Sequence, residues 1–177
     1  MKIYKKKCLI IKQIFLIFFL LSNCSNINDK KSEAKLSDKE IYATGLTSLQ
    51  KGDFKKAILE FDEVSLNYPF SSLASRSEIM SAYSYYENNE LKKAIVKLNN
   101  FIEMNPKGKL TEYANYLLAM CYYSQVSSEG RDSDLTIKAL NSFKLIVTKY
   151  PNTKYGKDSK LKIQFLENSL ARNELNI

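Results

Sequence analysis

The feature that most constrains this chain is a spacing pattern that recurs before each of its three prolines. An alanine lies twelve residues before each proline, and a large apolar residue lies eight residues before it. The pairs are Ala57 and Phe61 before Pro69, Ala94 and Leu98 before Pro106, and Ala139 and Phe143 before Pro151. A small residue lets two antiparallel helices approach closely, and a large apolar residue fills the space beside it. Proline ends the second helix because it has no N–H group to donate and clashes with the preceding turn. The pattern therefore predicts stacked helical hairpins.

This spacing resembles the tetratricopeptide repeat, which folds as a helical hairpin. We expect an all-α, tetratricopeptide-like array (α-solenoid) of three repeats and one further helix. The expected repeats are residues 37–71, 72–108 and 109–151, followed by a partial fourth over 152–177. In the third repeat the second helix is displaced further along the chain than the first, which predicts an insertion at about 125–134 that contains Arg131 and Asp132.

Several helix ends can be located in the same way. Ser37 and Glu40 form an S-x-x-E capping box at the start of the first helix, and Asp53 can cap the second. The last helix is expected at about 155–175, and its apolar residues cover more than one narrow stripe. A capping helix should have a polar outer face, so we expect the chain to be cut short inside a fourth repeat.

The first 23 residues combine a basic start with an apolar run that is too short to span a bilayer comfortably, which is typical of a signal peptide. They end at Leu21-Ser22-Asn23-Cys24, which resembles the lipobox of bacterial lipoproteins and predicts a lipid on Cys24. The alternative is an uncleaved signal anchor with an ordinary thiol at Cys24. Residues 24–36 are predicted to form a lipid-anchored flexible tether. The resemblance to bacterial lipoproteins implies that Ser25, in place of an aspartate beside the lipid, favours the outer membrane over the inner.

Charge and residue content argue against several classes of function. The signal segment carries five lysines and no acid, so the net charge of +8 falls to +3 without it and nucleic-acid binding loses its main support. The chain has no histidine and none of the common catalytic motifs, so we expect no enzyme activity, no cofactor and no metal site. Carboxylates such as Asp62 and Glu63 are expected on solvated faces, and Cys121 is expected to be a buried, inert thiol.

A binding surface is the remaining possibility. In stacked hairpins the first helices line the concave face, and the positions expected there recur every 37 residues in three series. They are Tyr42, Ile79 and Tyr116; Leu46, Tyr83 and Met120; and Leu49, Tyr86 and Tyr123. Tyrosine offers apolar area and a hydroxyl that can bond to an extended backbone, which suits a peptide groove. The alternative, that these side chains pack between helices, stays open for each of them.

A more specific resemblance rests on six features. They are Cys24, Tyr68-Pro69-Phe70-Ser71, the run from Tyr113 to Leu118 that leads to Cys121-Tyr122-Tyr123, Arg131-Asp132 in the insertion, the run from Tyr150 to Tyr155, and the run from Leu170 to Glu174. With these the chain resembles the BamD (ComL-like) family of outer-membrane assembly lipoproteins. The chain departs from that family by ending where a fourth of five repeats should continue.

The resemblance implies a lipid-anchored protein on the periplasmic face of the outer membrane, in the machinery that folds and inserts β-barrel proteins. Its implied partners are unfolded outer-membrane β-barrel proteins, the central barrel subunit and other lipoproteins of the machinery. An alternative reading is an envelope lipoprotein that pilots pilus secretins or coordinates cell-wall enzymes at division. The Arg131-Asp132 insertion and the run from Leu170 to Glu174 favour assembly over that alternative.

Overall fold

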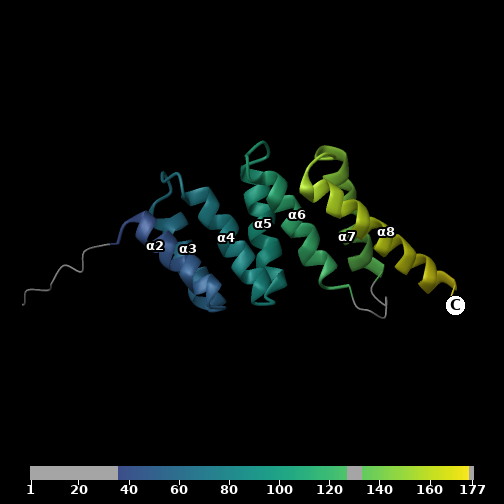
Figure 1. Cartoon of the computed structure of the whole chain (residues 1–177), viewed down its shortest axis with the longest axis horizontal. Coiled ribbons are helices and arrows are strands. Elements are labelled where there is room, and N and C mark those ends of the chain that lie inside the picture. Colours follow the sequence, from purple (N-terminus) through teal and green to yellow (C-terminus); the bar gives the residue numbers. More distant parts are fainter. Residues whose placement is uncertain (1–35, 127–132, 176–177) are drawn as a thin grey trace, which may run out of the picture. The chain divides into compact units, whose positions relative to one another are not determined.

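The computed structural model describes residues 36–126 and 133–175, and this part of the chain contains seven α-helices and no strand. The helices are α2 (Asp38–Gln50), α3 (Phe54–Asn67), α4 (Ala74–Glu87), α5 (Leu91–Met104), α6 (Thr111–Tyr123), α7 (Ser133–Lys149) and α8 (Lys154–Leu175). Figure 1 shows them side by side in chain order. The predicted signal peptide, Cys24 and the Arg131-Asp132 pair lie outside the described residues.

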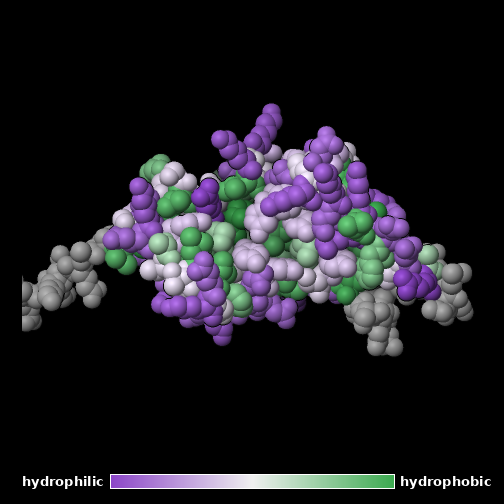
Figure 2. Space-filling view, viewed as in Figure 1, coloured by the Kyte–Doolittle hydropathy of each residue, from purple (hydrophilic) through white to green (hydrophobic). Residues whose placement is uncertain are grey.

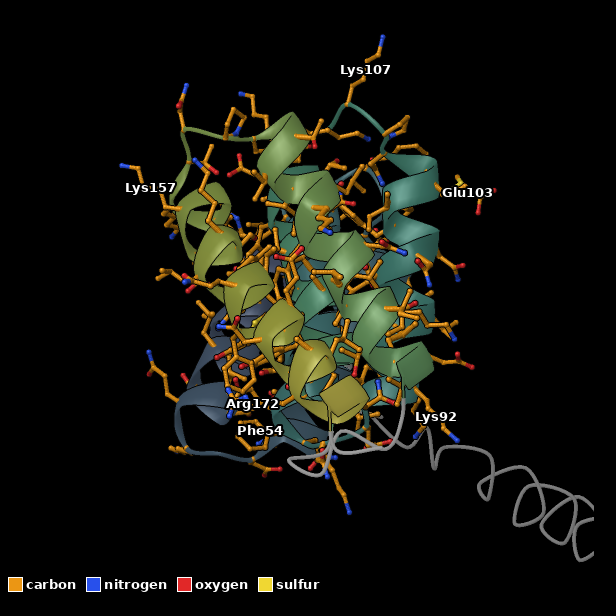
Figure 3. All side chains as sticks on the ribbon, turned by 90° about the vertical axis from the view of Figure 1, so that its right-hand side faces the viewer. Phe54, Lys92, Glu103, Lys107, Lys157 and Arg172 are labelled. Carbon is orange, nitrogen blue, oxygen red and sulfur yellow. The ribbon has the colours of Figure 1, made fainter. Side chains whose placement is uncertain are left out.

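The helices pair as three hairpins, α2 with α3, α4 with α5, and α6 with α7, while α8 packs on α7. Each helix contacts mainly its neighbours in the chain, and the first helices of successive hairpins also meet, α4 with α6 and α6 with α8. Viewed along the array, Lys157 of α8 and Glu103 of α5 point to opposite sides (Figure 3). The prediction of an all-α hairpin array of three repeats and one further helix is confirmed.

The predicted caps form at the starts of the first two helices. The Glu40 backbone N–H donates to Ser37 Oγ at 3.3 Å, and the Ser37 backbone N–H donates to Glu40 Oε2 at 2.8 Å. Asp53 Oδ1 accepts from the Lys56 backbone N–H at 3.2 Å. Between them Gly52 has a φ of 75°, a left-handed conformation that costs glycine little, so the turn into α3 is tight.

The close helix approach predicted from the repeat spacing is present in the first hairpin. A Cβ atom added to Gly45 of α2 would lie 2.8 Å from Phe61 Cε1 of α3. Phe61 and Ala57 are both fully buried. The ring therefore occupies space that only a residue without a side chain leaves open.

The apolar core continues along the array in two clusters. The first joins Ile79, Ala82, Ala94, Leu98, Phe101, Ala114, Leu117 and Cys121, and the second joins Ala119, Ala139, Leu140, Phe143, Ile146 and Leu166. Cys121 is buried as predicted, and burial raises the pKa of its thiol to about 12. The thiol therefore stays protonated at neutral pH, as expected for a packing residue.

One charged contact between hairpins differs from the expectation that carboxylates on the second helices are simply solvated. Lys97 Nζ of α5 lies 2.7 Å from Asp62 Oδ1 of α3, and the two side chains are only 27% and 25% exposed. The prediction treated α3 alone, whereas packing of consecutive hairpins brings α5 beside it. None of the helices in residues 36–126 and 133–175 is long and apolar enough to cross a membrane.

Candidate polypeptide-binding face

The residues predicted to form a groove lie on α2, α4 and α6, the first helices of the three hairpins. Eight of the nine are half-buried, so each side chain packs on the core with one part and is open to solvent with another. We call this surface, together with the adjoining side of α8, the first-helix face. In the view of Figure 2, hydrophobic residues (green) and residues of intermediate hydropathy (pale) lie between hydrophilic residues (purple) along the middle of the molecule.

Ile79 is the exception among the nine residues. It is 2% exposed and packs in the first core cluster. The equivalent Tyr42 is half-buried on α2, the first described helix, whereas α4 is packed between hairpins. Ile79 therefore supports the face from below and offers no surface to a ligand.

At the start of the array, Tyr42 packs its ring on Phe61 with 5.4 Å between ring centroids. Burial raises the pKa of Tyr42, and the positive charge of the nearby Arg76 acts in the opposite direction. Leu46 and Leu49 lie half-buried one and two turns further along α2. This end of the face thus presents an aromatic ring, two aliphatic side chains and one cation.

The centre of the face is formed by Tyr83 and Tyr86 of α4. Their rings stack with a centroid separation of 6.3 Å and an interplanar angle of 24°. Interaction with the Glu87 carboxylate, together with burial, raises the pKa of Tyr83 to about 12. Ser124 Oγ donates to Tyr86 Oη at 3.2 Å, so a bond between side chains links α4 to the end of α6. Both rings are held in place by neighbours before any ligand arrives.

Helix α8 adds a second aromatic group beside α6. Tyr116 packs against Tyr155 with 4.8 Å between ring centroids, and Tyr155 packs against Tyr113 at 5.6 Å. Tyr116 Oη donates to Asp158 Oδ2 at 2.6 Å. Burial and this hydrogen bond raise the pKa of Tyr116, so its phenol stays protonated at neutral pH.

The far end of the face combines aromatic rings with a cation. Tyr123 meets Phe165 edge to face at 6.0 Å between centroids, and Lys162 Nζ lies 5.0 Å from the centre of the Tyr123 ring. Phe165 is 54% exposed, and Met120 lies half-buried on the preceding turn of α6. A large apolar ring is therefore available to solvent next to a positive charge.

The residues of α8 were not predicted as part of the groove. Tyr155, Asp158, Lys162 and Phe165 are spaced by three, four and three residues, which places them on one side of a helix. That spacing was a usable signal. It was missed because the 37-residue step that identified the other positions does not extend past the insertion in the third repeat.

The arrangement suits binding better than chemistry. Its polar atoms are phenol hydroxyls and a few charged groups, and the raised pKa values of Tyr83 and Tyr116 keep these two phenols protonated at neutral pH. Among the residues that the structure describes, no three acidic, cysteine or histidine side chains are placed to hold a metal ion. Rings and hydroxyls that are already packed can take up an extended backbone with little loss of side-chain entropy.

Comparison with known proteins adds an independent finding. The family model described as "YfiO: Outer membrane lipoprotein" matches residues 34–177. The chain is similar to the outer membrane protein assembly factor BamD of Caulobacter vibrioides, with 36% identity over 137 residues that cover 77% of this chain and 45% of the relative. The Rickettsia prowazekii protein of the same name is 32% identical over 168 residues, which cover 95% of this chain and 66% of the relative. The chain thus spans about half to two thirds of the length of these relatives.

Proposed function

The chain belongs to the YfiO family of outer membrane lipoproteins, and we propose on this basis that it takes part in the assembly of β-barrel proteins in the outer membrane. The observation that carries the proposal is the family match over residues 34–177, which includes every helix that the structure describes. The two relatives described above bear the name of outer membrane protein assembly factor BamD.

In the proposed role, the first-helix face holds an extended segment of an unfolded barrel protein. The aromatic rings of Tyr83, Tyr86 and Phe165 contact apolar side chains of the segment, and phenol hydroxyls bond to its backbone. Apolar contacts and backbone hydrogen bonds recognise a pattern of apolar residues rather than one particular sequence. They therefore suit a factor that binds many different barrel proteins. The segment is held without a covalent step and is then passed on.

The remaining parts of the proposal concern location and partners. Lipidation of Cys24 would anchor the chain to the periplasmic face of the outer membrane, and residues 24–36 would set the reach of the helical array. The central barrel subunit and other lipoproteins of the assembly machinery would be its partners. The insertion that contains Arg131 and Asp132 is proposed as one of the contacts with them.

The groove is tested by replacing Tyr83 and Tyr86 together with alanine in the full chain. A labelled peptide from the carboxyl terminus of a barrel protein should then bind at least about tenfold more weakly, because two central aromatic contacts are lost. Tyr85→Ala is the matched control, since Tyr85 lies on the same helix but lines the other side of α4 near Val96. Unchanged affinity of the double variant, at unchanged helicity by circular dichroism, would reject the groove.

A further inference from the structure

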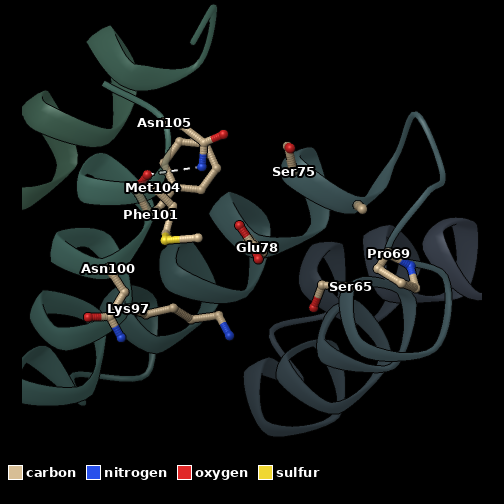
Figure 4. Close-up of a pocket in the computed structure, with 10 residues that line it drawn as sticks. Ser65, Pro69, Ser75, Glu78, Lys97, Asn100, Phe101, Met104 and Asn105 are labelled. Atoms are coloured by element: carbon tan, nitrogen blue, oxygen red, sulfur yellow. Dashed lines mark hydrogen bonds between the residues drawn. The ribbon is translucent and has the colours of Figure 1, made fainter. Parts of the chain in front are cut away.

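A second surface depression lies on the side of the array that the second helices form. It has a volume of about 400 Å³ and is lined by residues of α3, α4 and α5. Its lining includes Ser65 of α3, Glu78 of α4, and Lys97, Asn100, Phe101 and Met104 of α5. Figure 4 shows Glu78 in its middle, between Met104 and Asn100 on one side and Ser65 on the other. We call it the second-helix pocket.

This pocket is separate from the first-helix face, although α4 contributes to both. At about 100° per residue, Glu78 and Tyr83 are turned about 140° apart around the axis of α4. Glu78 and Tyr85 are seven residues apart, which is nearly two turns, so they lie on the same side. A ligand in the second-helix pocket would therefore leave Tyr83 open, and Tyr86 is separated from Glu78 by about 80° around the helix axis and about 12 Å along it.

The two charged side chains that line the pocket, Glu78 and Lys97, do not pair with each other. Lys97 Nζ is engaged by Asp62 Oδ1 at 2.7 Å. Within residues 36–126 and 133–175 the Glu78 carboxylate has no hydrogen bond and no ion pair, and Lys97 and Asp62 act on it only at longer range. The ammonium group of Lys97 is thus paired with Asp62, and the Glu78 carboxylate is left without a partner among the described residues.

Partial burial raises the pKa of Glu78, while Lys97 lowers it and Asp62 raises it. Partial burial removes some of the water around the Glu78 carboxylate, and no group of the described residues donates a hydrogen bond to it in return. A cation from outside the chain would compensate for this loss.

We propose that the second-helix pocket binds an arginine side chain from an extended segment of a partner protein. A guanidinium group can donate two parallel hydrogen bonds to the Glu78 carboxylate, whereas a lysine ammonium acts as a point charge. The methylene groups of the arginine can lie along Met104, which is 79% exposed. The unpaired Glu78 carboxylate is what selects a cationic group at this point of the pocket.

The surroundings of the pocket also specify what flanks the arginine. A second depression of about 440 Å³ shares Lys97 and Asn100 with the pocket and continues along α5 to Val96, which is 60% exposed. Lys92 and Lys93 line this depression as well, so the arginine is expected at Glu78 and an apolar residue of the ligand at Val96. Val96 and Met104 are eight residues apart, which is about 12 Å along a helix. In an extended chain, residues four apart are separated by about 13 Å, and alternate side chains point to the same side. The expected ligand therefore reads apolar-x-Arg-x-apolar.

The test uses the full chain and a labelled peptide that carries Leu-Ser-Arg-Ser-Leu, followed by fluorescence anisotropy. We expect saturable binding that Glu78→Gln weakens at least about tenfold, because a hydrogen bond to a charged group is lost. Met104→Ser should weaken it by a smaller factor. Glu63→Gln is the matched control, since Glu63 is an exposed carboxylate on α3 outside the pocket and should leave affinity unchanged.

Three results would overturn the proposal. One is equal binding of a peptide with glutamine in place of arginine, and another is unchanged affinity of the Glu78→Gln chain. The third is a dimer in sedimentation that Met104→Glu dissociates, since a second copy would then occupy the pocket. The double replacement of Tyr83 and Tyr86 should leave binding of this peptide unchanged, so failure here and failure of the proposed barrel-peptide groove are distinguishable.

Discussion

Replacement of Gly45 by alanine tests whether the first hairpin depends on close helix contact. The added Cβ atom would lie 2.8 Å from Phe61 Cε1 and 3.0 Å from two further atoms of the same ring. Carbon atoms attract best at about 3.5–4.0 Å, so these contacts are strongly repulsive. The ring is fully buried and already packs against Tyr42, which leaves it little room to move away.

The expected change in stability is the difference between two opposing effects. Alanine favours a helix interior over glycine by about 0.5–1 kcal/mol. Overpacking of a well-packed core costs about 1–3 kcal/mol. The repulsion should prevail, and the free energy of unfolding should fall by about 1 kcal/mol.

Urea unfolding followed by circular dichroism measures this change in the full chain. Phe61→Leu provides the internal control, because the smaller side chain leaves space for the new methyl group. In that background Gly45→Ala should cost less or become stabilising, with a coupling energy of at least about 0.5 kcal/mol. A variant Gly45→Ala that is more stable than the parent chain would refute the packing argument.

Two further predictions concern groups between and within the hairpins. In a double-mutant cycle, Asp62→Ala and Lys97→Ala should show a coupling energy of about 0.5–1 kcal/mol, because this ion pair is partly exposed. The coupling energy should become smaller in high salt. A coupling energy of zero would show that the ion pair does not stabilise the contact between the hairpins. Cys121 should react with iodoacetamide at pH 8 only after urea unfolds the chain. The pKa of the Cys121 thiol is about 12 in the folded chain and about 8.5 in the unfolded chain. The contribution of the thiol to stability is therefore complete below about pH 8.5 and is lost as the pH rises toward about 12. Equal labelling rates in native and unfolded chains would contradict the burial of Cys121.

The helices were predictable because each carries its own local signal. Proline ends α3, α5 and α7, a capping box begins α2, and the offsets between Ala57, Phe61 and Pro69 repeat along the chain. Hairpin stacking follows from short connections and from small residues at the crossings. Gly45 against Phe61 is a contact that could be anticipated from spacing alone.

The surfaces were less predictable because they depend on which helices become neighbours. Tyr42 and Ile79 occupy equivalent positions, yet Ile79 is buried between hairpins and Tyr42 is partly open. Asp62 was expected to be a solvated carboxylate, but the packing of consecutive hairpins places Lys97 of α5 beside it. The residues of α8 were missed because they join the face through tertiary contacts with Tyr116 and Tyr123.

Because of the same tertiary packing, α4 contributes to two different surfaces, the first-helix face on one side and the second-helix pocket on another. Its first-helix side presents the stacked rings of Tyr83 and Tyr86, while its other side presents the Glu78 carboxylate, which has no partner among the described residues, in the second-helix pocket. Salt should therefore distinguish the two surfaces, because screening weakens an exposed ionic contact but not the burial of apolar area. Binding of the arginine peptide should fall as salt rises from low to physiological concentration. Binding of the barrel peptide should change little over the same range, and an equal salt dependence would mean that one surface serves both ligands.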